Sequence, residues 1–121
     1  MSGDLSQTLN NLREAGGLDL VAVVGSDGLL IDSSQSPDVD AESFSAMAAS
    51  GLLMMDAMGR ELDQGPAKQA ILEYDHSVAI LTPLADELVL IALARGDSNL
   101  GRVRLVLRRS MDEVAGAVSA I

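Results

Sequence analysis

The chain has no cysteine and no tryptophan, and Phe44 and Tyr74 are its only aromatic residues. Without cysteine it can form no disulfide, zinc–thiolate site or iron–sulfur cluster, and it has no thiol nucleophile. Two aromatic rings are too few to make a stacking platform for nucleic acid bases. Basic residues are also scarce: eight against 18 acidic ones give a net charge of −10, which disfavours nucleic acid and anionic membranes as partners.

Long apolar runs are missing as well. No run reaches the 18 residues that a membrane-spanning helix needs, and residues 1–19 lack the basic and apolar regions of a secretory signal. We therefore expect a cytoplasmic protein that does not insert into membranes. With 121 residues and an apolar fraction of 48%, the chain has the size of one folded domain, residues 1–121.

Apolar spacing and turn signals predict eight elements in the order α-β-β-α-β-β-β-α. Helices are expected over residues 2–16, 40–63 and 98–118, and strands over Leu18–Val24, Leu29–Ile31, Ala67–Asp75, Val78–Leu81 and Leu88–Ala94. Short turns between strands favour a five-stranded, mainly antiparallel sheet with helices packed on it, an α/β (α+β) fold.

The segments between these elements carry further signals. Asp32–Val39 is rich in serine and is expected to be a surface loop, and Pro83–Glu87 is expected to be a turn. Ala67–Asp75 alternates in polarity, as a half-exposed strand at a sheet edge does. Asp40 is expected to cap the long helix, and Asp97 or Ser98 the last one.

No catalytic or metal site emerges from the pattern. His76 is the sole histidine, and its neighbours in sequence point away from it on an extended chain, so they form no triad. Gly25–Gly28 lacks the spacing of a phosphate-binding loop. The alternating acids Asp38, Asp40 and Glu42 lack the remaining ligands of a calcium loop. We expect neither an enzyme nor a metal or other cofactor.

The long helix has an unusual composition. Its expected core stripe consists of Phe44, Met47, Ala48, Gly51, Met55, Met58 and Leu62. The opposite face is small and apolar where a solvated face would carry Glu, Lys and Gln: Ala46, Ala49, Ser50, Leu53, Ala57 and Arg60. Such a face predicts a partner-binding surface. The alternatives are a helix enclosed within the monomer, or an alanine-rich surface without a partner.

Charge is unevenly distributed along the chain. Residues 1–63 carry 11 of the 18 acidic side chains and two of the eight basic ones. Four arginines crowd the last helix, at positions 102, 104, 108 and 109, and are expected to form a solvated outer face that pairs with nearby acids. This helix is expected to lie on the sheet face opposite the long helix.

Three features in the right order resemble the roadblock/light-chain-7 family. They are the hairpin Val21–Ile31, the small-residue helix after Asp40, and the segment Asp97–Arg109, which is similar to the end of the last strand and the start of the last helix in bacterial members. The resemblance covers Leu5 to Val118. It implies a three-layer α/β/α sandwich that forms dimers and acts on small Ras-like GTPases, as a regulator or as a scaffold.

The resemblance also implies where the contacts lie. Leu53 and Ala57 match positions that bacterial members use for the GTPase, and Ala46, Ala49, Ser50 and Arg60 extend that face. In the family's dimers the middle strand and the long helix meet their copies. The corresponding residues here are Met54, Met58, Ala67, Gln69, Ile71 and Glu73. Arg60 is not assigned the role of an arginine finger, and a small-molecule sensor or adaptor domain is the alternative function.

Overall fold

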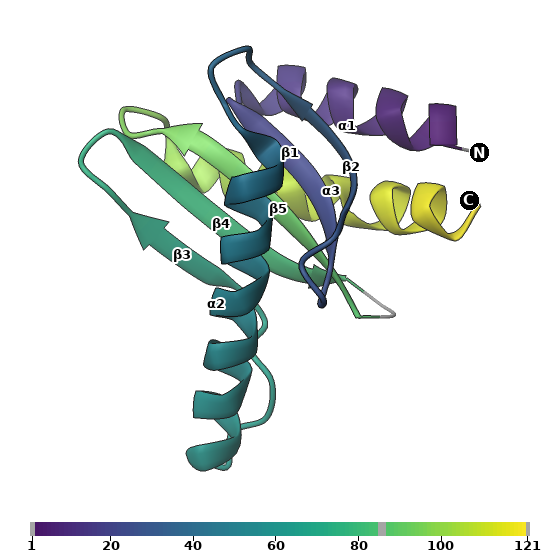
Figure 1. The fold of residues 1–121 in the computed structure, drawn as a ribbon. Helices are drawn as coiled ribbons and strands as arrows, with labels where there is room; N and C mark the ends of the chain where they lie inside the picture. The colour runs from purple at the N-terminus through teal and green to yellow at the C-terminus, as the bar shows by residue number, and fades with distance from the viewer. Residues whose placement is uncertain (1, 85–86, 121) are drawn as a thin grey trace.

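The computed structural model describes residues 2–84 and 87–120. Its elements are α1 (Ser2–Gly16), β1 (Leu20–Gly25), β2 (Leu30–Gln35), α2 (Ala41–Glu61), β3 (Ala70–Glu73), β4 (Ser77–Leu84), β5 (Leu88–Arg95) and α3 (Leu100–Ser119). The five strands form one antiparallel sheet in the order β2-β1-β5-β4-β3. Helices α1 and α3 cover one face and α2 lies on the other (Figure 1). The predicted α+β sandwich and its element order are confirmed.

The sheet has a separate apolar core on each face. Strand β1 supplies both, because its side chains alternate: Val21 and Val23 pack under α1 and α3, whereas Leu20, Ala22 and Val24 pack under α2. All five are fully buried, as expected for a strand covered on both sides.

Strand β2 differs from the sequence-based expectation. It begins at Leu30 and runs to Gln35, so the first half of the expected loop Asp32–Val39 is strand. Contacts from α1 explain the difference: Ser6 Oγ donates to Asp32 Oδ2 at 2.6 Å, and Arg13 Nε donates to the buried Ser34 Oγ at 2.8 Å. Helix α1 thus satisfies the polar groups that made this strand look like a loop.

Other boundaries also shift. Strand β3 covers only Ala70–Glu73 of the expected Ala67–Asp75, and β4 extends into the expected turn Pro83–Glu87, in which residues 85 and 86 lie outside the described residues. The cap of α3 is Asn99, whose Oδ1 accepts from the Arg102 N–H at 3.0 Å, and is neither Asp97 nor Ser98.

Asp40 caps α2 as expected. Its Oδ1 accepts from the backbone N–H of Ser43 at 3.2 Å, and its Oδ2 accepts from the Ser43 hydroxyl at 3.0 Å. These hydrogen bonds favour the ionised carboxyl and hold the pKa of Asp40 below its usual range. The cap fixes where α2 begins.

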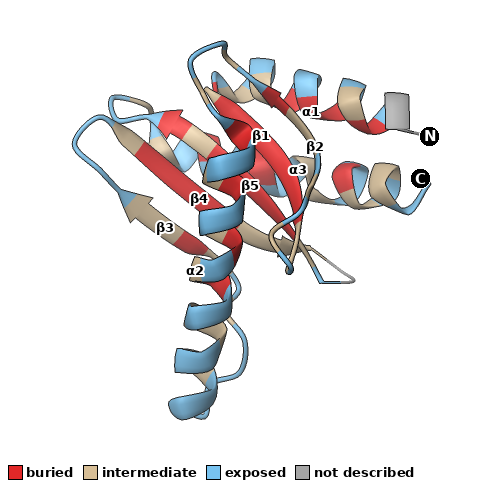
Figure 2. Ribbon diagram, in the orientation of Figure 1, coloured by how far each residue is buried: buried red, intermediate tan, exposed pale blue. Residues whose placement is uncertain are grey.

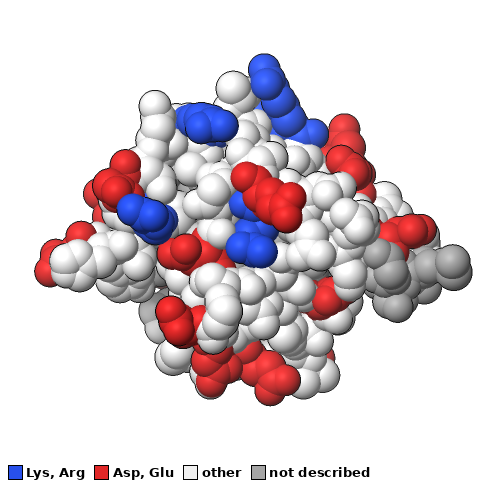
Figure 3. All heavy atoms as spheres, turned by 90° about the horizontal axis from the view of Figure 1, so that it is seen from above, with Lys and Arg blue, Asp and Glu red and all other residues white. Residues whose placement is uncertain are grey.

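The α3 arginines do not pair with acids as expected. Arg102, Arg104, Arg108 and Arg109 are exposed, and among the described residues the sole salt bridge joins Arg95 to Asp97 at 3.1 Å. Arg104 Nε donates to Gln69 Oε1 instead. In Figure 3 the Lys and Arg atoms lie in the upper and middle parts of the view, and the lower part carries only acidic and uncharged residues. The helix carrying these four arginines lies on the sheet face opposite α2, as expected.

After α2 the chain folds back against the helix before it enters β3. Asp56 Oδ1 accepts from the Ala67 N–H at 2.9 Å, and the Gln64 N–H donates to the Gly59 carbonyl at 2.8 Å. Gly65 has φ +82°, a conformation that favours glycine. A β carbon at Gly59 would overlap the Gly65 carbonyl oxygen, so the return loop depends on a glycine in the helix at this point.

We expect Gly59→Ala to destabilise the protein, although alanine is the better helix former. The overlap with Gly65 forces the return loop away from α2, which is expected to lower the free energy of unfolding by about 1–3 kcal/mol. Urea denaturation at fixed protein concentration measures the change. Gly116→Ala in α3 is the matched control, because its β carbon would meet nothing within 4 Å, and it should be neutral or stabilising. Equal stability of the two variants would contradict the prediction.

Candidate functional site: the exposed flanks of the long helix and the β3 edge

Helix α2 extends well beyond the sheet that it covers. Its buried residues, Ala41, Ser45, Ala49 and Leu52, all lie in the first 12 of its 21 residues. The C-terminal part projects past the strands, and Figure 2 shows it exposed or only partly buried throughout. A projecting helix in a monomer would be expected to be mostly charged and polar, whereas the charged residues among residues 53–61 are Asp56, Arg60 and Glu61, and the other positions are apolar or glycine.

The exposed apolar residues gather along one side of α2, which we call the methionine stripe: Met47, Met54, Met58 and Leu62. Their side chains are 70%, 68%, 59% and 67% exposed. Met47, Met58 and Leu62 were expected in the core, and this expectation is wrong. The helix is rotated so that Leu52 and three small residues are buried against the sheet, and the methionines of the stripe point outward.

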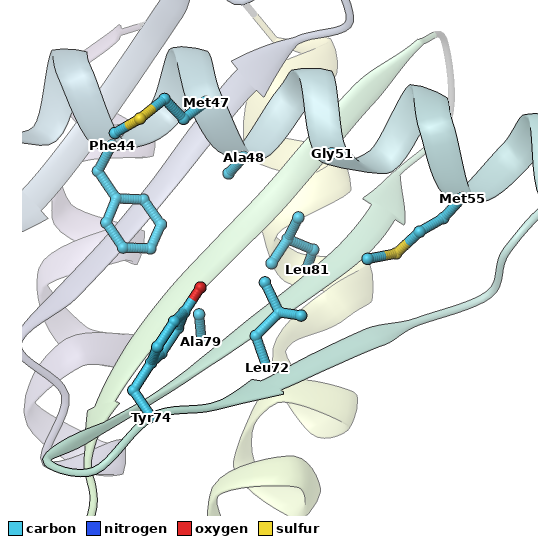
Figure 4. A pocket seen from close by; sticks show the side chains of 9 residues that line it. All are labelled: Phe44, Met47, Ala48, Gly51, Met55, Leu72, Tyr74, Ala79 and Leu81. Atoms are coloured by element: carbon cyan, nitrogen blue, oxygen red, sulfur yellow. The ribbon is translucent and has the colours of Figure 1, made fainter.

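An apolar groove separates α2 from β3 and β4. It has a volume of about 190 Å³ and is lined by Phe44, Met47, Ala48, Gly51, Met55, Leu72, Tyr74, Ala79 and Leu81. In Figure 4 the side chains of Phe44 and Met55 reach into it from α2, and those of Leu72 and Tyr74 face them from the side of the sheet. All five helix residues of this lining were expected in the core stripe, and the sequence did not show that they line an open groove.

The other flank of α2 carries the predicted partner-binding residues. Leu53 is 51% exposed, and Ala46, Ser50, Ala57 and Arg60 are exposed around it. Ala49 is 1% exposed and packs in the core, so its assignment to this surface is wrong. The same rotation of the helix that exposes the methionines turns Ala49 inward. The remaining five residues form what we call the Leu53 flank.

A shallow hollow adjoins the Leu53 flank. It has a volume of about 210 Å³, and besides Leu53 it is lined by Asp56 of α2, Ser26 of the β1–β2 turn, and Glu87 next to β5. Since 3.6 residues make one helical turn, Leu53 and Met54 project about 100° apart. The Leu53 flank and the methionine stripe are therefore two separate surfaces of one helix.

Strand β3 is an edge of the sheet, as its alternating polarity predicted. The Tyr74 N–H donates to the Ser77 carbonyl at 2.8 Å, which directs the backbone groups of Tyr74 toward β4. Because these directions alternate along an antiparallel strand, the N–H and C=O groups of Ile71 and Glu73 point away from the sheet. Ala67 precedes the strand, and its N–H is bound by Asp56.

No other type of site is evident in the described ranges. Residues 2–84 and 87–120 contain no group of three or more His, Cys, Asp or Glu side chains that could hold a metal ion. His76 is exposed in the turn between β3 and β4. Across the same ranges, no helix is both long and apolar enough to cross a membrane.

A five-stranded antiparallel sheet with two helices on one face and one long, incompletely covered helix on the other defines a class of small α+β domains. The chain belongs to the Roadblock/LC7 domain family, whose sequence model matches residues 5–94. This match ends within β5. The segment Asp97–Arg109, which was one of the three features of the resemblance, lies outside it.

The chain is also similar to solved structures and to a curated protein sequence. MglB of Myxococcus xanthus superposes with a TM-score of 0.88 at 19% identity, covering 97% of this chain and 96% of that one, so it supports the fold through α3. A Roadblock/LC7 domain from Streptomyces avermitilis is 28% identical, with a TM-score of 0.69, covering 90% and 96% of the two chains. An uncharacterized protein of Methanocaldococcus jannaschii is 30% identical over 110 residues, 91% of this chain and 96% of that protein.

Proposed function

We propose that the protein is a homodimeric, non-enzymatic regulator of a small Ras-like GTPase, which it contacts through the Leu53 flank. The observation that carries this proposal is a half-exposed leucine among alanines, where a solvated helix would carry charged residues. The resemblance to bacterial Roadblock/LC7 members supports a Ras-like GTPase as the partner, because Leu53 and Ala57 match the positions that those members use. The setting of the activity is cytoplasmic.

The second copy covers the methionine stripe and pairs with the β3 edge. Four large apolar side chains that are mostly exposed, on a helix that projects from the sheet, favour an interface between proteins over a free surface. Gly51 supports the same proposal, because a β carbon there would meet nothing within 4 Å, so no contact within the chain requires glycine. A glycine beside the methionines lets a second helix approach closely.

The separation of the two surfaces lets the dimer bind a GTPase without dissociating. The dimer uses the β3 side of α2, and the GTPase uses the side that adjoins the β1–β2 turn. The acidic residues near the Leu53 flank, Glu42, Asp56 and Glu87, outnumber its one basic residue, Arg60, so a GTPase surface with basic residues fits it best.

The test uses a Ras-like GTPase encoded near this protein's gene, loaded with a non-hydrolysable GTP analogue. We expect a complex on size-exclusion chromatography with light scattering. If no such GTPase binds in either nucleotide state, the proposal fails. A GTP turnover assay on the same pair then distinguishes a GTPase activator, which accelerates hydrolysis, from a scaffold, which leaves the rate unchanged.

The groove beside Tyr74 favours one second candidate function, a small-molecule sensor. Its lining is apolar apart from the Tyr74 hydroxyl, so it would accept a small apolar ligand. A thermal melt in the presence of a metabolite collection tests this function. A melting temperature that no compound raises would argue against it.

We expect Glu73→Pro to disrupt the dimer while the monomer stays folded. Proline removes the N–H that points away from the sheet, and it leaves the hydrogen bonds between β3 and β4 in place because Glu73 does not donate to β4. Sedimentation equilibrium measures the dissociation constant, which should rise by about tenfold or more. Glu73→Ala keeps the N–H and is the control. If both variants dimerise equally, the edges do not pair.

A further inference from the structure

Arg104 is held at the β3 edge without an acidic partner. Gln69 links strand β4 to helix α3. Its Nε2 donates to Thr82 Oγ1 at 3.3 Å, and its Oε1 accepts from Arg104 Nε at 3.1 Å. This hydrogen bond directs the Arg104 guanidinium toward the β3 edge, although the residue is exposed on the helix surface. Within residues 2–84 and 87–120 no carboxylate forms a salt bridge with it.

The surroundings of Arg104 favour an incoming carboxylate. Gln69, Thr82, Arg104 and Arg108 line a hollow of about 120 Å³ together with Leu107 and Met111, and this lining contains no acidic residue. In a chain of net charge −10, a hollow with two arginines and no acid is complementary to the acidic remainder of the molecule. A second copy of this chain is thus a partner of suitable charge.

The geometry of the β3 edge determines which acidic residue of the second copy would lie next to Arg104. The outward backbone groups belong to odd-numbered residues, and the side chains of these residues lie on the α3 side: Ile71 packs in the core under α1 and α3, and Gln69 reaches Arg104. Glu73 shares this side by the alternation of the strand, and it is exposed. Glu73 and Arg104 therefore lie on the same face of the sheet.

The proposed dimer brings the two residues together. When two β3 edges join antiparallel about a two-fold axis through Ile71, Gln69 lies directly opposite the second copy's Glu73, with β carbons about 5 Å apart. This register uses the outward backbone groups of all three residues, Gln69, Ile71 and Glu73. We infer that Arg104, oriented by Gln69, forms an ion pair with Glu73 of the second copy, and that symmetry makes this pair twice in each dimer.

This inference rests on the proposed dimer and adds to it a specific charge contact on the α3 side. The contact explains why Arg104 bonds an uncharged amide within its own chain, since Gln69 positions the guanidinium and leaves its terminal N–H groups free. The contact would also make dimerisation selective, because a chain with an acidic residue at position 104 would repel Glu73 across the interface.

Charge reversal tests the contact. Arg104→Glu and Glu73→Arg should each raise the dimer dissociation constant by about tenfold or more, because each places like charges together twice per dimer. The double variant, Arg104→Glu with Glu73→Arg, should return to within about threefold of the wild-type value. Sedimentation equilibrium at low and high salt gives the constants, and circular dichroism melts verify that each variant is folded.

Arg109→Glu is the matched control, since it makes the same charge change on the other flank of α3 and should leave the constant within about threefold. If the wild type dimerises and neither single variant differs from this control, the ion pair is wrong and the dimer stands. Failure of the double variant to recover also overturns the pairing. A wild type that is monomeric at every concentration overturns both the ion pair and the proposed dimer.

Discussion

Replacing Leu53 by arginine is expected to abolish binding of the GTP-loaded GTPase and to leave the dimer unchanged. Leu53 lies at the middle of the Leu53 flank, with Ala46 and Ser50 before it and Ala57 and Arg60 after it. An arginine at this position would put an unpaired charge against the partner at the centre of the contact, and desolvating such a charge costs several kcal/mol. We expect the affinity to fall about 100-fold or more, measured by isothermal titration calorimetry.

Leu105→Arg is the control for that substitution. Leu105 is also a partly exposed leucine on a helix, 43% exposed, but it lies on α3 at the opposite face of the sheet. It makes the same change of size and charge and should leave GTPase binding unaltered. If Leu53→Arg binds the GTPase as tightly as the wild type, the Leu53 flank is not the contact surface, whatever the dimer does.

The acidic residues near the Leu53 flank predict that GTPase binding depends on the salt concentration. If Glu42, Asp56 and Glu87 face basic residues of the GTPase, raising the ionic strength should slow association more than it speeds dissociation. The same charges help to keep the free dimer soluble. The four arginines of α3 lie on the sheet face opposite α2, whereas the acidic residues near the Leu53 flank belong to α2 and to the loops beside it.

Local signals predicted most of the fold. The order of elements, the cap at Asp40 and the edge position of β3 follow from spacing, capping chemistry and alternation, which act over a few residues. Strand β2 was only partly predicted, because its polar residues are satisfied by Ser6 and Arg13 of α1, more than 20 residues away. Such pairing over a distance leaves no periodic pattern in the strand itself.

The rotation of α2 could not be read from periodicity. The buried residues of the helix are Leu52 and three small ones, and the methionines make a more apolar stripe on another side of the helix. A hydrophobic stripe indicates that one side of a helix is buried. It does not distinguish burial within the monomer from burial against a partner chain. The expected core stripe was therefore wrong for Met47, Met58 and Leu62, and the proposed dimer would bury these residues against a second copy instead. The misplacement of Ala49 follows from that same rotation.

If the methionine stripe is the dimer interface, charged residues placed in it should dissociate the dimer. The double substitution Met54→Glu with Met58→Glu is expected to convert the dimer to a folded monomer. Both side chains are mostly exposed within the chain, so the core loses no contacts, and glutamate is a good helix former. In the dimer, four apolar side chains would be replaced by carboxylates, with a loss of about 6 kcal/mol or more of apolar burial alone.

The oligomeric state is measured by light scattering across a concentration series, and the melting of the monomer is followed by circular dichroism. Met54→Leu with Met58→Leu preserves the apolar surface and should remain dimeric. A glutamate variant that dimerises like the leucine variant would show that the stripe is not the interface. A monomeric glutamate variant that still binds the GTPase with reduced affinity would show that each chain carries its own Leu53 flank, and that the dimer strengthens binding by presenting two of them.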